Sequence, residues 1–571
     1  MTSPRPHDLR ISGGVVVSTF TGEHFAADVL VRGDTVSGVL PPGTPAVAAE
    51  EVDATGHLVV PGFVDAHMHV ESSFLTPRAF ADATLARGTT TVLADPHEIV
   101  NVAGAEAMRW MIEAGAGTEQ TQLWGVPSCV PAVEGLEGAG ASLGAADIAR
   151  MLDWPGVVAL GEVMDYRAVV GGDARMAEVV AAARARSAIL DGHCPNLSGA
   201  DLSAYLATGV DSDHTKNRTE VLVEKARLGM LMMLQEKCLL PEVVRALLAL
   251  PMLPPFCLVT DDLAADHIVS SGHLDHIGRV AVRAGLPPEA VLRALTWNPA
   301  QRLRLPDRGV VTPGKRADLV LLRGELADFD PALVIAGGRV VARDGVTPGE
   351  EDGAEACPPA ADGLTGTVHL EPQRPEDFTW RTTLPDGVHT FRAMRVNPRD
   401  TYTEEAAVDL PVRDGKVDWE GRTVLVRVRN RYGEPGTTFA PLLGRDLTEG
   451  AVATTYAHDS HNLVTIGTSA LSMANAAQAV VNDGGGVAVV HGRTVVARLP
   501  LPVGGVMSAE PAPEVAARSR QVREALAAWG WDHLNPFMSV STLTLAVSPA
   551  LKITDRSLVD VVRREPVTAT V

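Results

Sequence analysis

The feature that most constrains the fold is a unit that repeats between residues 58 and 305: a short apolar run, a loop, and a stretch with helical spacing. Eight strands alternating with helices over roughly 250 residues are typical of a (β/α)8 barrel. We therefore expect an α/β chain with a TIM-type barrel; a doubly wound open sheet is the alternative. The expected strands are residues 58–65, 90–95, 122–127, 157–161, 188–191, 209–212, 230–234 and 257–260, and the clearest expected helices are residues 77–87, 174–186 and 241–250.

The segments that flank this repeat have the composition of short strands. Residues 8–57 alternate β-branched runs with Gly, Asp and Pro, and a matching segment returns at residues 309–341. A chain of 571 residues also exceeds what one hydrophobic core supports. The division that we expect is a small β-sandwich of residues 1–57 plus 306–348, a barrel of residues 58–305, an acidic linker rich in Pro and Gly at 349–363, and a C-terminal α/β domain at 364–571.

The net charge and the cysteine content limit the classes of partner and the compartment that we expect. A net charge of −21 argues against nucleic acid and anionic membranes, since both reward clustered Lys and Arg. No window reaches the roughly 18 to 20 unbroken apolar residues of a membrane span. The five cysteines are scattered and form no Cys-x-x-Cys pair, so we expect reduced thiols in a cytoplasmic protein that binds a small molecule. A homodimer is compatible with such barrels, although no stretch of the sequence demonstrates one.

The first expected barrel strand ends in two histidines, His67 and His69, spaced by one residue. Alternate side chains of a strand point to the same face, so the two imidazoles project together with Met68 opposite. Two imidazoles placed in this way can bind one metal ion. A buried strand that simply ends in polar residues facing water gives the same pattern.

Metal-binding or acid–base groups follow nearly every expected strand. In a barrel these positions share one rim, where the active site lies. Each residue alone could be an ordinary loop side chain, but the joint set suffices for two divalent ions that share a bridging carboxylate. Mixed nitrogen and oxygen ligands suit manganese, which we expect, or iron or zinc. The set is His67, His69, Asp95, His97, Glu98, Glu162, Asp191, His193, Asp213, His214, Asp261 and Asp262.

Longer motifs extend over nearly the whole chain. They are Pro-Gly-Phe-Val-Asp-Ala-His-Met-His-Val-Glu at 61–71, Asp-Pro-His-Glu at 95–98, Gly-Glu-Val-Met at 161–164, Asp-Gly-His at 191–193, Gly-His-Leu-Asp-His at 272–276, Asn-Pro-Ala at 298–300, Pro-Gly-Lys-Arg-Ala-Asp at 313–318, His-Asp-Ser-His-Asn at 458–462, Leu-Pro-Leu-Pro at 499–502 and Asn-Pro-Phe-Met at 535–538. Together these motifs resemble the adenine deaminase family of the amidohydrolase superfamily.

That resemblance implies a role for each rim residue. It implies one ion held by His67, His69 and Asp261, a second held by His193 and His214, and Glu162 as the bridge. It also places Glu98 beside the ions, where it handles protons or touches the base. Asp95, His97 and Asp262 are further substrate-binding candidates.

The reaction implied is hydrolysis of adenine to hypoxanthine and ammonia, as in purine salvage. A hydroxide made near neutral pH by two ions attacks C6, and Asp261 or Glu98 moves a proton to the ring and to the leaving amine. The cytidine-deaminase route is excluded because the sequence has no Pro-Cys-x-x-Cys. The alternatives are hydrolysis of a modified adenine or a cyclic amide, and a barrel that binds a purine without turnover.

Two departures from the family pattern concern substrate preference. Thr215 follows Ser-Asp-His where the family usually has Glu, and Leu263 begins a segment where the family tends toward Arg-His-Pro-Asp-Asp. Both changes leave the implied metal ligands intact. Residues 458–462 are open to two interpretations, a metal or substrate contact or a hydrogen-bonded turn that seals a domain interface.

Overall fold

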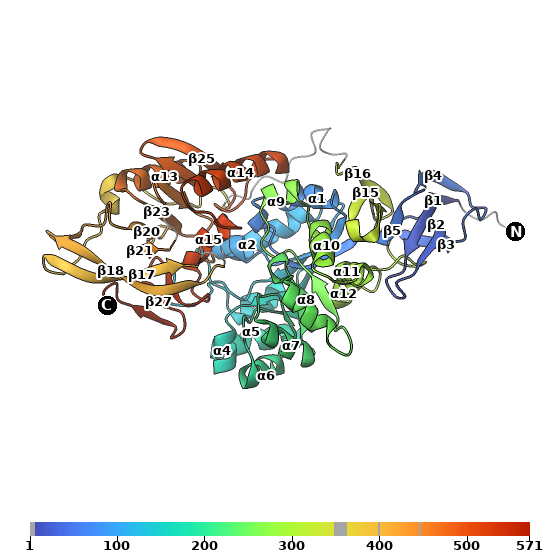
Figure 1. The fold of residues 1–571 in the computed structure, drawn as a ribbon, viewed down its shortest axis with the longest axis horizontal. Coiled ribbons are helices and arrows are strands. Elements are labelled where there is room, and N and C mark those ends of the chain that lie inside the picture. Colours follow the sequence, from blue (N-terminus) through green and yellow to red (C-terminus); the bar gives the residue numbers. More distant parts are fainter. Residues whose placement is uncertain (1–5, 348–362, 398–399, 445–446) are drawn as a thin grey trace.

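The protein has three regions arranged along one long axis (Figure 1). A computed structural model describes residues 6–347, 363–397, 400–444 and 447–571. An N-terminal sheet lies at one end, parallel strands with helices lie in the middle, and a large C-terminal sheet lies at the other end. The predicted linker at 349–363 lies outside the described residues except for Gly363.

The N-terminal sheet joins strands from two distant parts of the chain. Its eight strands follow the order β16-β15-β14-β5-β1-β2-β3, with β4 paired to β1, so β5 lies antiparallel to a strand that comes more than 250 residues later. The strands are β1 (His7–Val17), β2 (His24–Arg32), β3 (Thr35–Leu40), β4 (Ala48–Asp53), β5 (Leu58–Pro61), β14 (Leu319–Arg323), β15 (Asp330–Ala336) and β16 (Arg339–Arg343).

Strand β14 shows how this sheet is fixed to the rest of the molecule. Its side chains alternate between two faces. Leu319 and Leu321 pack into the apolar interior of the N-terminal sheet, whereas Val320 and Leu322 pack into a second cluster with the neighbouring helices. Because one strand contributes to two hydrophobic cores, the sheet and the central region are held together by the burial of apolar surface.

The first expected barrel strand, residues 58–65, is divided in the structure. Strand β5 ends at Pro61 and β6 (Phe63–Met68) begins after Gly62, so the prediction of one continuous strand was wrong. The N–H of Gly62 donates to the carbonyl of Asp318 at 2.8 Å. A Cβ at Gly62 would lie 2.2 Å from Thr90 Oγ1. Only glycine therefore lets the chain pass from one sheet to the next at this point.

The central region contains eight parallel strands, which match the expected strands in number and order. They form a five-stranded sheet, β10-β9-β8-β7-β6, and a three-stranded sheet, β11-β12-β13. A parallel bridge between Met68 and Asp261 links the end of β6 to the loop after β13. Besides β6 the strands are β7 (Thr89–Ala94), β8 (Thr121–Val126), β9 (Val157–Val163), β10 (Ile189–Gly192), β11 (Ser212–Asp213), β12 (Leu231–Leu234) and β13 (Phe256–Leu258).

Helices follow the strands, and their start signals are local. Proline occupies the first turn of α1, α8 and α11, and Asp173 caps α5 by accepting from the N–H of Met176 at 3.0 Å. The three predicted helices are confirmed within two residues. The helices are α1 (Pro77–Leu85), α2 (His97–Gly115), α3 (Ala145–Met151), α4 (Tyr166–Gly171), α5 (Ala174–Ala185), α6 (Gly199–Ala207), α7 (Thr219–Arg227), α8 (Pro241–Leu248), α9 (Ala265–Ser270), α10 (Leu274–Arg283), α11 (Pro288–Leu295) and α12 (Trp297–Arg302).

The C-terminal region is built on a nine-stranded sheet with the order β19-β18-β17-β21-β20-β23-β22-β24-β25. Helices α13 (Ala470–Asn482), α14 (Ala512–Ala528) and α15 (Pro536–Ser541) accompany it, and β26 (Leu551–Ile553), β27 (Leu558–Asp560) and β28 (Glu565–Val567) form a small separate sheet. The nine strands are β17 (Gly387–Val396), β18 (Thr403–Arg413), β19 (Lys416–Val417), β20 (Val424–Arg429), β21 (Thr437–Leu443), β22 (Ala451–Thr454), β23 (Leu463–Gly467), β24 (Gly486–His491) and β25 (Thr494–Pro500).

The C-terminal region packs directly on the central one. The ring of Phe74 lies 5.1 Å from that of Tyr456 and 5.0 Å from that of Phe537, in edge-to-face arrangements. Arg523 of α14 forms an ion pair with Asp266 of α9 at 2.7 Å. These contacts hold the segment around Tyr456 against the ends of the parallel strands.

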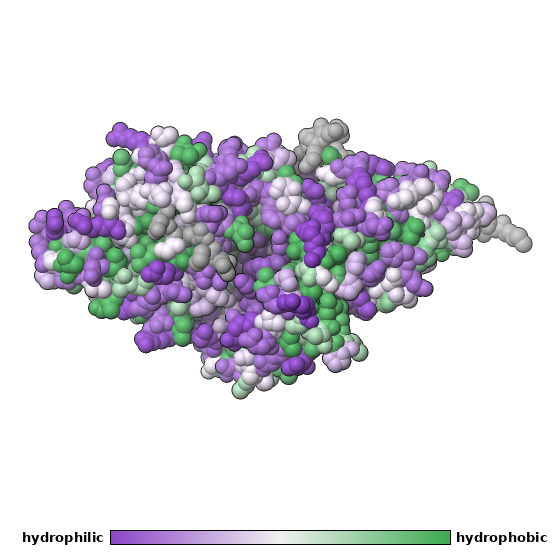
Figure 2. Space-filling view, viewed as in Figure 1, coloured by the Kyte–Doolittle hydropathy of each residue, from purple (hydrophilic) through white to green (hydrophobic). Residues whose placement is uncertain are grey.

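The outer surface is largely polar on the face shown in Figure 2, where apolar residues form small scattered groups. Within the described part of the chain, every helix is too short or too polar to cross a bilayer.

Candidate active site

His67 and His69, at the end of β6, are buried, and their rings are held in defined orientations. Nδ1 of His67 lies 2.6 Å from Asp191 Oδ2, and Nδ1 of His69 lies 2.9 Å from the carbonyl oxygen of Asp95. These partners accept a proton from Nδ1, so Nε2 is the ring atom of each histidine that remains for a metal ligand bond. Both Nε2 atoms face Asp261 Oδ1, at 3.6 Å for His67 and 3.2 Å for His69.

Glu162, at the end of β9, lies at the centre of the cluster. Its Oε2 is 2.5 Å from His193 Nδ1 and 3.0 Å from His214 Nε2. Its Oε1 is 3.7 Å from His69 Nε2 and 3.6 Å from His97 Nδ1. Each carboxylate oxygen thus faces its own pair of imidazoles, which is the arrangement of a carboxylate that bridges two ions.

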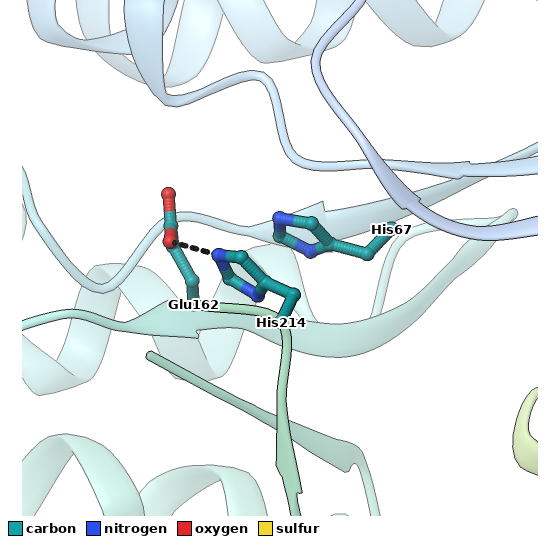
Figure 3. A group of neighbouring side chains, drawn as sticks. All are labelled: His67, Glu162 and His214. Atoms are coloured by element: carbon teal, nitrogen blue, oxygen red, sulfur yellow. Dashed lines mark ion pairs between the residues drawn. The ribbon is translucent and has the colours of Figure 1, made fainter. Parts of the chain in front are cut away.

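The rings of His67 and His214 are stacked, with centroids 3.7 Å apart, and the carboxylate of Glu162 lies beside them (Figure 3). The Nε2 atom of His67 and the Nδ1 atom of His214 are buried without a hydrogen-bond partner among the described residues. A buried polar atom without a partner lowers the stability of the folded state. These two atoms therefore indicate a bound partner other than the described side chains.

The spacing of the ligand atoms fits metal ions. Metal–ligand distances of about 2.0–2.2 Å in a tetrahedral site separate neighbouring ligand atoms by roughly 3.3–3.6 Å. The distances of 3.2 and 3.6 Å from Asp261 Oδ1 to the two imidazoles are close to that range. Several overlapping groups of buried side chains have compatible geometry, among them His67–His69–Asp261, His67–Glu162–His214, His69–His97–Glu162 and His97–His458–Asp459. The residues present therefore fit divalent ions.

The remaining predicted residues, Asp95, His97 and Asp262, lie at three different places around the cluster. Asp95 accepts from the N–H of Glu162 at 2.9 Å, which places it behind the bridging carboxylate. His97 was predicted to bind substrate. Its Nδ1 lies 3.6 Å from Glu162 Oε1, so it is close enough to share a metal ion with Glu162. Asp262 accepts from the hydroxyl of Ser72 at 2.6 Å, and that hydroxyl lies 2.8 Å from the hydroxyl of Tyr456 in the C-terminal region.

Two residues of this site lack a sequence signal. Lys237, which follows β12, has its Nζ 3.5 Å from Asp261 Oδ2. Gln235 donates from Nε2 to the carbonyl of His214 at 2.8 Å. Neither belongs to a recognisable motif, so only the fold brings them to the cluster.

Glu98, at the start of α2, is surrounded by side chains from the C-terminal region. Its Oε2 lies 2.6 Å from His461 Nε2, and its Oε1 lies 3.1 Å from His458 Nε2. The hydroxyl of Tyr456 donates to Oε1 at 3.2 Å. Burial alone would raise the pKa of Glu98, but His458, His461 and His97 hold it well below its ordinary value. Glu98 is therefore a buried carboxylate that stays ionised.

The segment 458–462 is thus both a domain contact and part of the site. His458 and His461 reach Glu98, while Asn462 donates from Nδ2 to the carbonyl of Gly138 at 2.7 Å. Both interpretations offered by the sequence describe part of what these residues do.

Solvent reaches the cluster from one side. The side chain of His193 is 26% exposed, whereas those of His67, His69, Glu162 and His214 are 4% exposed or less. Lys237 is 55% exposed on the same rim. The cluster is therefore open to solvent beside His193 and Lys237.

The comparisons with known proteins concern almost the whole chain. The amidohydrolase family model matches residues 58–341, and the adenine deaminase C-terminal domain model matches residues 400–565. Adenine deaminase 2 of Shouchella clausii is 39% identical over 89% of this chain and 89% of its own length. Adenine deaminase 2 of Rhizobium johnstonii is 37% identical over 98% of this chain and 93% of its own length. Adenine deaminase of Clostridium perfringens is 36% identical over 89% of this chain and 90% of its own length.

The chain belongs to the adenine deaminase family. This membership confirms the resemblance inferred from the motifs between residues 61 and 538. Among solved structures, an adenosine deaminase from Xanthomonas campestris with bound zinc aligns with a TM-score of 0.46 at 17% identity, over 60% of this chain and 95% of that one.

Proposed function

We propose that this protein hydrolyses adenine to hypoxanthine and ammonia at a centre of two divalent metal ions. The observation that carries the proposal is the buried carboxylate of Glu162, whose two oxygens face separate pairs of imidazoles. The names of the relatives supply the substrate, since three of them are adenine deaminases similar over most of their length.

The proposal includes a closed (β/α)8 barrel and the domain division given above. Closure is supported by the bridge between Met68 and Asp261 and by the N–H of Asp261, which donates to the carbonyl of His67 at 3.3 Å. These contacts join the two parallel sheets at one edge. The division is supported by the separate sheets on either side of the parallel strands.

His67, His69 and Asp261 would hold the first ion, His193 and His214 would hold the second, and the carboxylate of Glu162 would be shared between them. Bound ions lower the pKa of water and so provide a nucleophile near neutral pH. The mixed nitrogen and oxygen ligands suit manganese, with iron and zinc as alternatives. His97 is an additional ligand candidate for the ion nearest Glu162 Oε1.

Asp261 and Glu98 move the protons. Burial would raise the pKa of Asp261, but Lys237, His67 and His69 hold it well below its ordinary value, so Asp261 is an ionised base next to the attacking water. As the water oxygen bonds to C6 of adenine, one proton of the water passes to Asp261 and from there to N1 of the ring. The second proton, on the new C6 hydroxyl, is relayed through Glu98 to the amino nitrogen, so the bond from C6 to that nitrogen breaks, ammonia leaves, and the oxygen stays on C6 as the carbonyl of hypoxanthine.

Thr215 bears less on substrate preference than its sequence position suggests. Its hydroxyl donates to Asp213 Oδ1 at 2.8 Å, and Lys225 forms a buried ion pair with the same carboxylate at 2.8 Å. The Thr215 side chain is therefore turned into a hydrogen-bonded group behind His214. Leu263 packs on the central hydrophobic cluster. It is the remaining difference from the family sequence pattern that supports a modified adenine as the alternative substrate.

The proposal also places the enzyme in the cytoplasm, with a small purine as partner and a homodimer as the assembly. The location is supported by the cysteines, because the four in the described residues, Cys129, Cys194, Cys238 and Cys257, are buried and unpaired.

The test is to purify the protein from cells supplied with manganese, offer adenine, substituted adenines and cyclic amides, and measure ammonia together with bound metal. We expect equal amounts of ammonia and hypoxanthine from adenine. Metal-loaded protein that releases no ammonia from any purine would overturn the proposal. A faster rate with a substituted adenine or a cyclic amide would favour the alternative substrate.

A further inference from the structure

A second group of metal-binding side chains lies on the rim, outside the buried cluster. Glu236 belongs to the 3-10 helix η2 (Glu236–Cys238), His267 to α9 and His276 to α10. Their side chains are 45%, 31% and 17% exposed, so the group is open to solvent on one side. The proposed deamination assigns no role to any of the three.

Both imidazoles face the same carboxylate oxygen. Glu236 Oε2 lies 3.6 Å from His267 Nε2 and 3.2 Å from His276 Nε2, and the two rings meet edge to face with centroids 4.9 Å apart. The Nε2 atom of His276 is shielded from solvent and makes no hydrogen bond within the described part of the chain. An ordinary surface ion pair explains one imidazole at such an oxygen, but it does not explain two.

These separations are those of ligands around one ion. They fall close to the roughly 3.3–3.6 Å between ligand atoms of a tetrahedral zinc site. Burial lowers the pKa of His267 and so favours the neutral imidazole that binds metals. The nearby His276 holds the pKa of Glu236 below its ordinary range, which keeps the carboxylate ionised.

We infer that Glu236, His267 and His276 form a separate site for a divalent transition ion of the zinc class, with a fourth position open to water. Two histidines and one glutamate with an open position are a common zinc ligand set. The ion joins η2 to α9 and α10. This inference is independent of the proposed deamination.

An ion at this site is connected to the buried cluster through η2. Lys237 follows Glu236 directly and faces Asp261, while Gln235 precedes it and holds the carbonyl of His214. Fixing Glu236 therefore fixes the backbone that positions both contacts. Occupancy of the rim site is expected to stabilise the folded protein.

The experiment measures zinc by equilibrium dialysis of the full-length, metal-free protein. We expect Glu236→Gln and His276→Gln each to bind one equivalent less than the wild type. The control is His491→Gln, which removes a solvent-exposed histidine that lies 3.4 Å from Glu449 and outside both sites, and should bind as the wild type does. Wild-type stoichiometry in both rim variants would overturn the inference.

A second measurement separates this site from the buried one. The double variant His67→Ala, His69→Ala should retain one equivalent of zinc that is lost when His276→Gln is added. Zinc should also raise the melting temperature of this double variant, and His276→Gln should abolish that rise. Absence of any zinc binding or thermal shift in the folded double variant would also overturn the inference, whatever the deaminase assay shows.

Discussion

Two buried glutamates in this protein are each surrounded by histidines, but the histidines come from different places. Those around Glu162 come from the ends of neighbouring parallel strands. Those around Glu98 come from the C-terminal region, about 360 residues later in the chain. His97 stands between the two, with Nδ1 3.6 Å from Glu162 Oε1 and Nε2 3.8 Å from Glu98 Oε1.

The two halves of this site are therefore brought together in two different ways. Parallel strands deliver their C-terminal ends to one rim whatever the rest of the chain does. The surroundings of Glu98 depend on the docking of one region on the other, to which the packing of Phe74 against Tyr456 and Phe537 contributes. Metal binding should therefore depend on the Glu162 group, whereas the Glu98 group should contribute to proton transfer without holding metal.

The largest expected effect is that of Glu162→Gln. Loss of the bridging charge should remove bound metal and slow adenine deamination by roughly 10³-fold, equivalent to about 4 kcal/mol of transition-state stabilisation. Metal content and ammonia release are measured together, with the exposed Glu134→Gln as control. Full metal content in Glu162→Gln would show that this carboxylate is not the bridge.

Glu98→Gln should separate the two groups. Its amide keeps the size of the side chain but cannot relay a proton, so deamination should fall by about 10²-fold while bound metal stays at the wild-type level. The measurement is kcat for adenine beside the metal content of the same preparation. A variant that loses its metal as well would mean that Glu98 belongs to the metal centre.

Asp191→Asn tests the orientation of His67 on the Glu162 side. The carboxylate accepts from Nδ1 of His67 at 2.6 Å, and removing its charge should weaken metal affinity by roughly 10-fold to 100-fold. Dialysis against buffered manganese gives the affinity. Adding metal should restore most of the activity, and a loss that excess metal cannot restore would contradict an orienting role.

The smallest expected effect is the pH dependence of stability that comes from Glu137, a buried residue of the central region near Asp459 of the C-terminal region. Burial, with the nearby Asp459, raises the pKa of Glu137 to about 8. The folded protein therefore holds a proton that the unfolded chain releases near pH 4.5, so stability falls as pH rises toward 8. The fall should be about 1 kcal/mol between pH 7 and 8.

Thermal unfolding of Glu137→Gln at pH 7 and pH 8 checks this effect. The amide carries no titrating proton, so the variant should lose less melting temperature than the wild type over this interval. An equal loss in both proteins would show that Glu137 titrates normally.

Much of this site could be predicted from the sequence because strand and helix patterns are set by residues that are close together in the chain. The apolar runs and helical stretches predicted eight parallel strands in order, and strand ends predicted that His67, Glu162 and His214 would meet. The break at Gly62 was missed, since an apolar run does not show that its two halves pair with different sheets.

By itself, the sequence determined the family, the order of the parallel strands and the residues that gather at their ends, because side-chain alternation and strand direction act over short stretches of chain. Only the tertiary structure decided that His458 and His461 would enclose Glu98, that Lys237 would reach Asp261, and that Glu236, His267 and His276 would converge on the rim. These contacts depend on how separate elements pack against one another. That packing comes from apolar surfaces distributed over hundreds of residues.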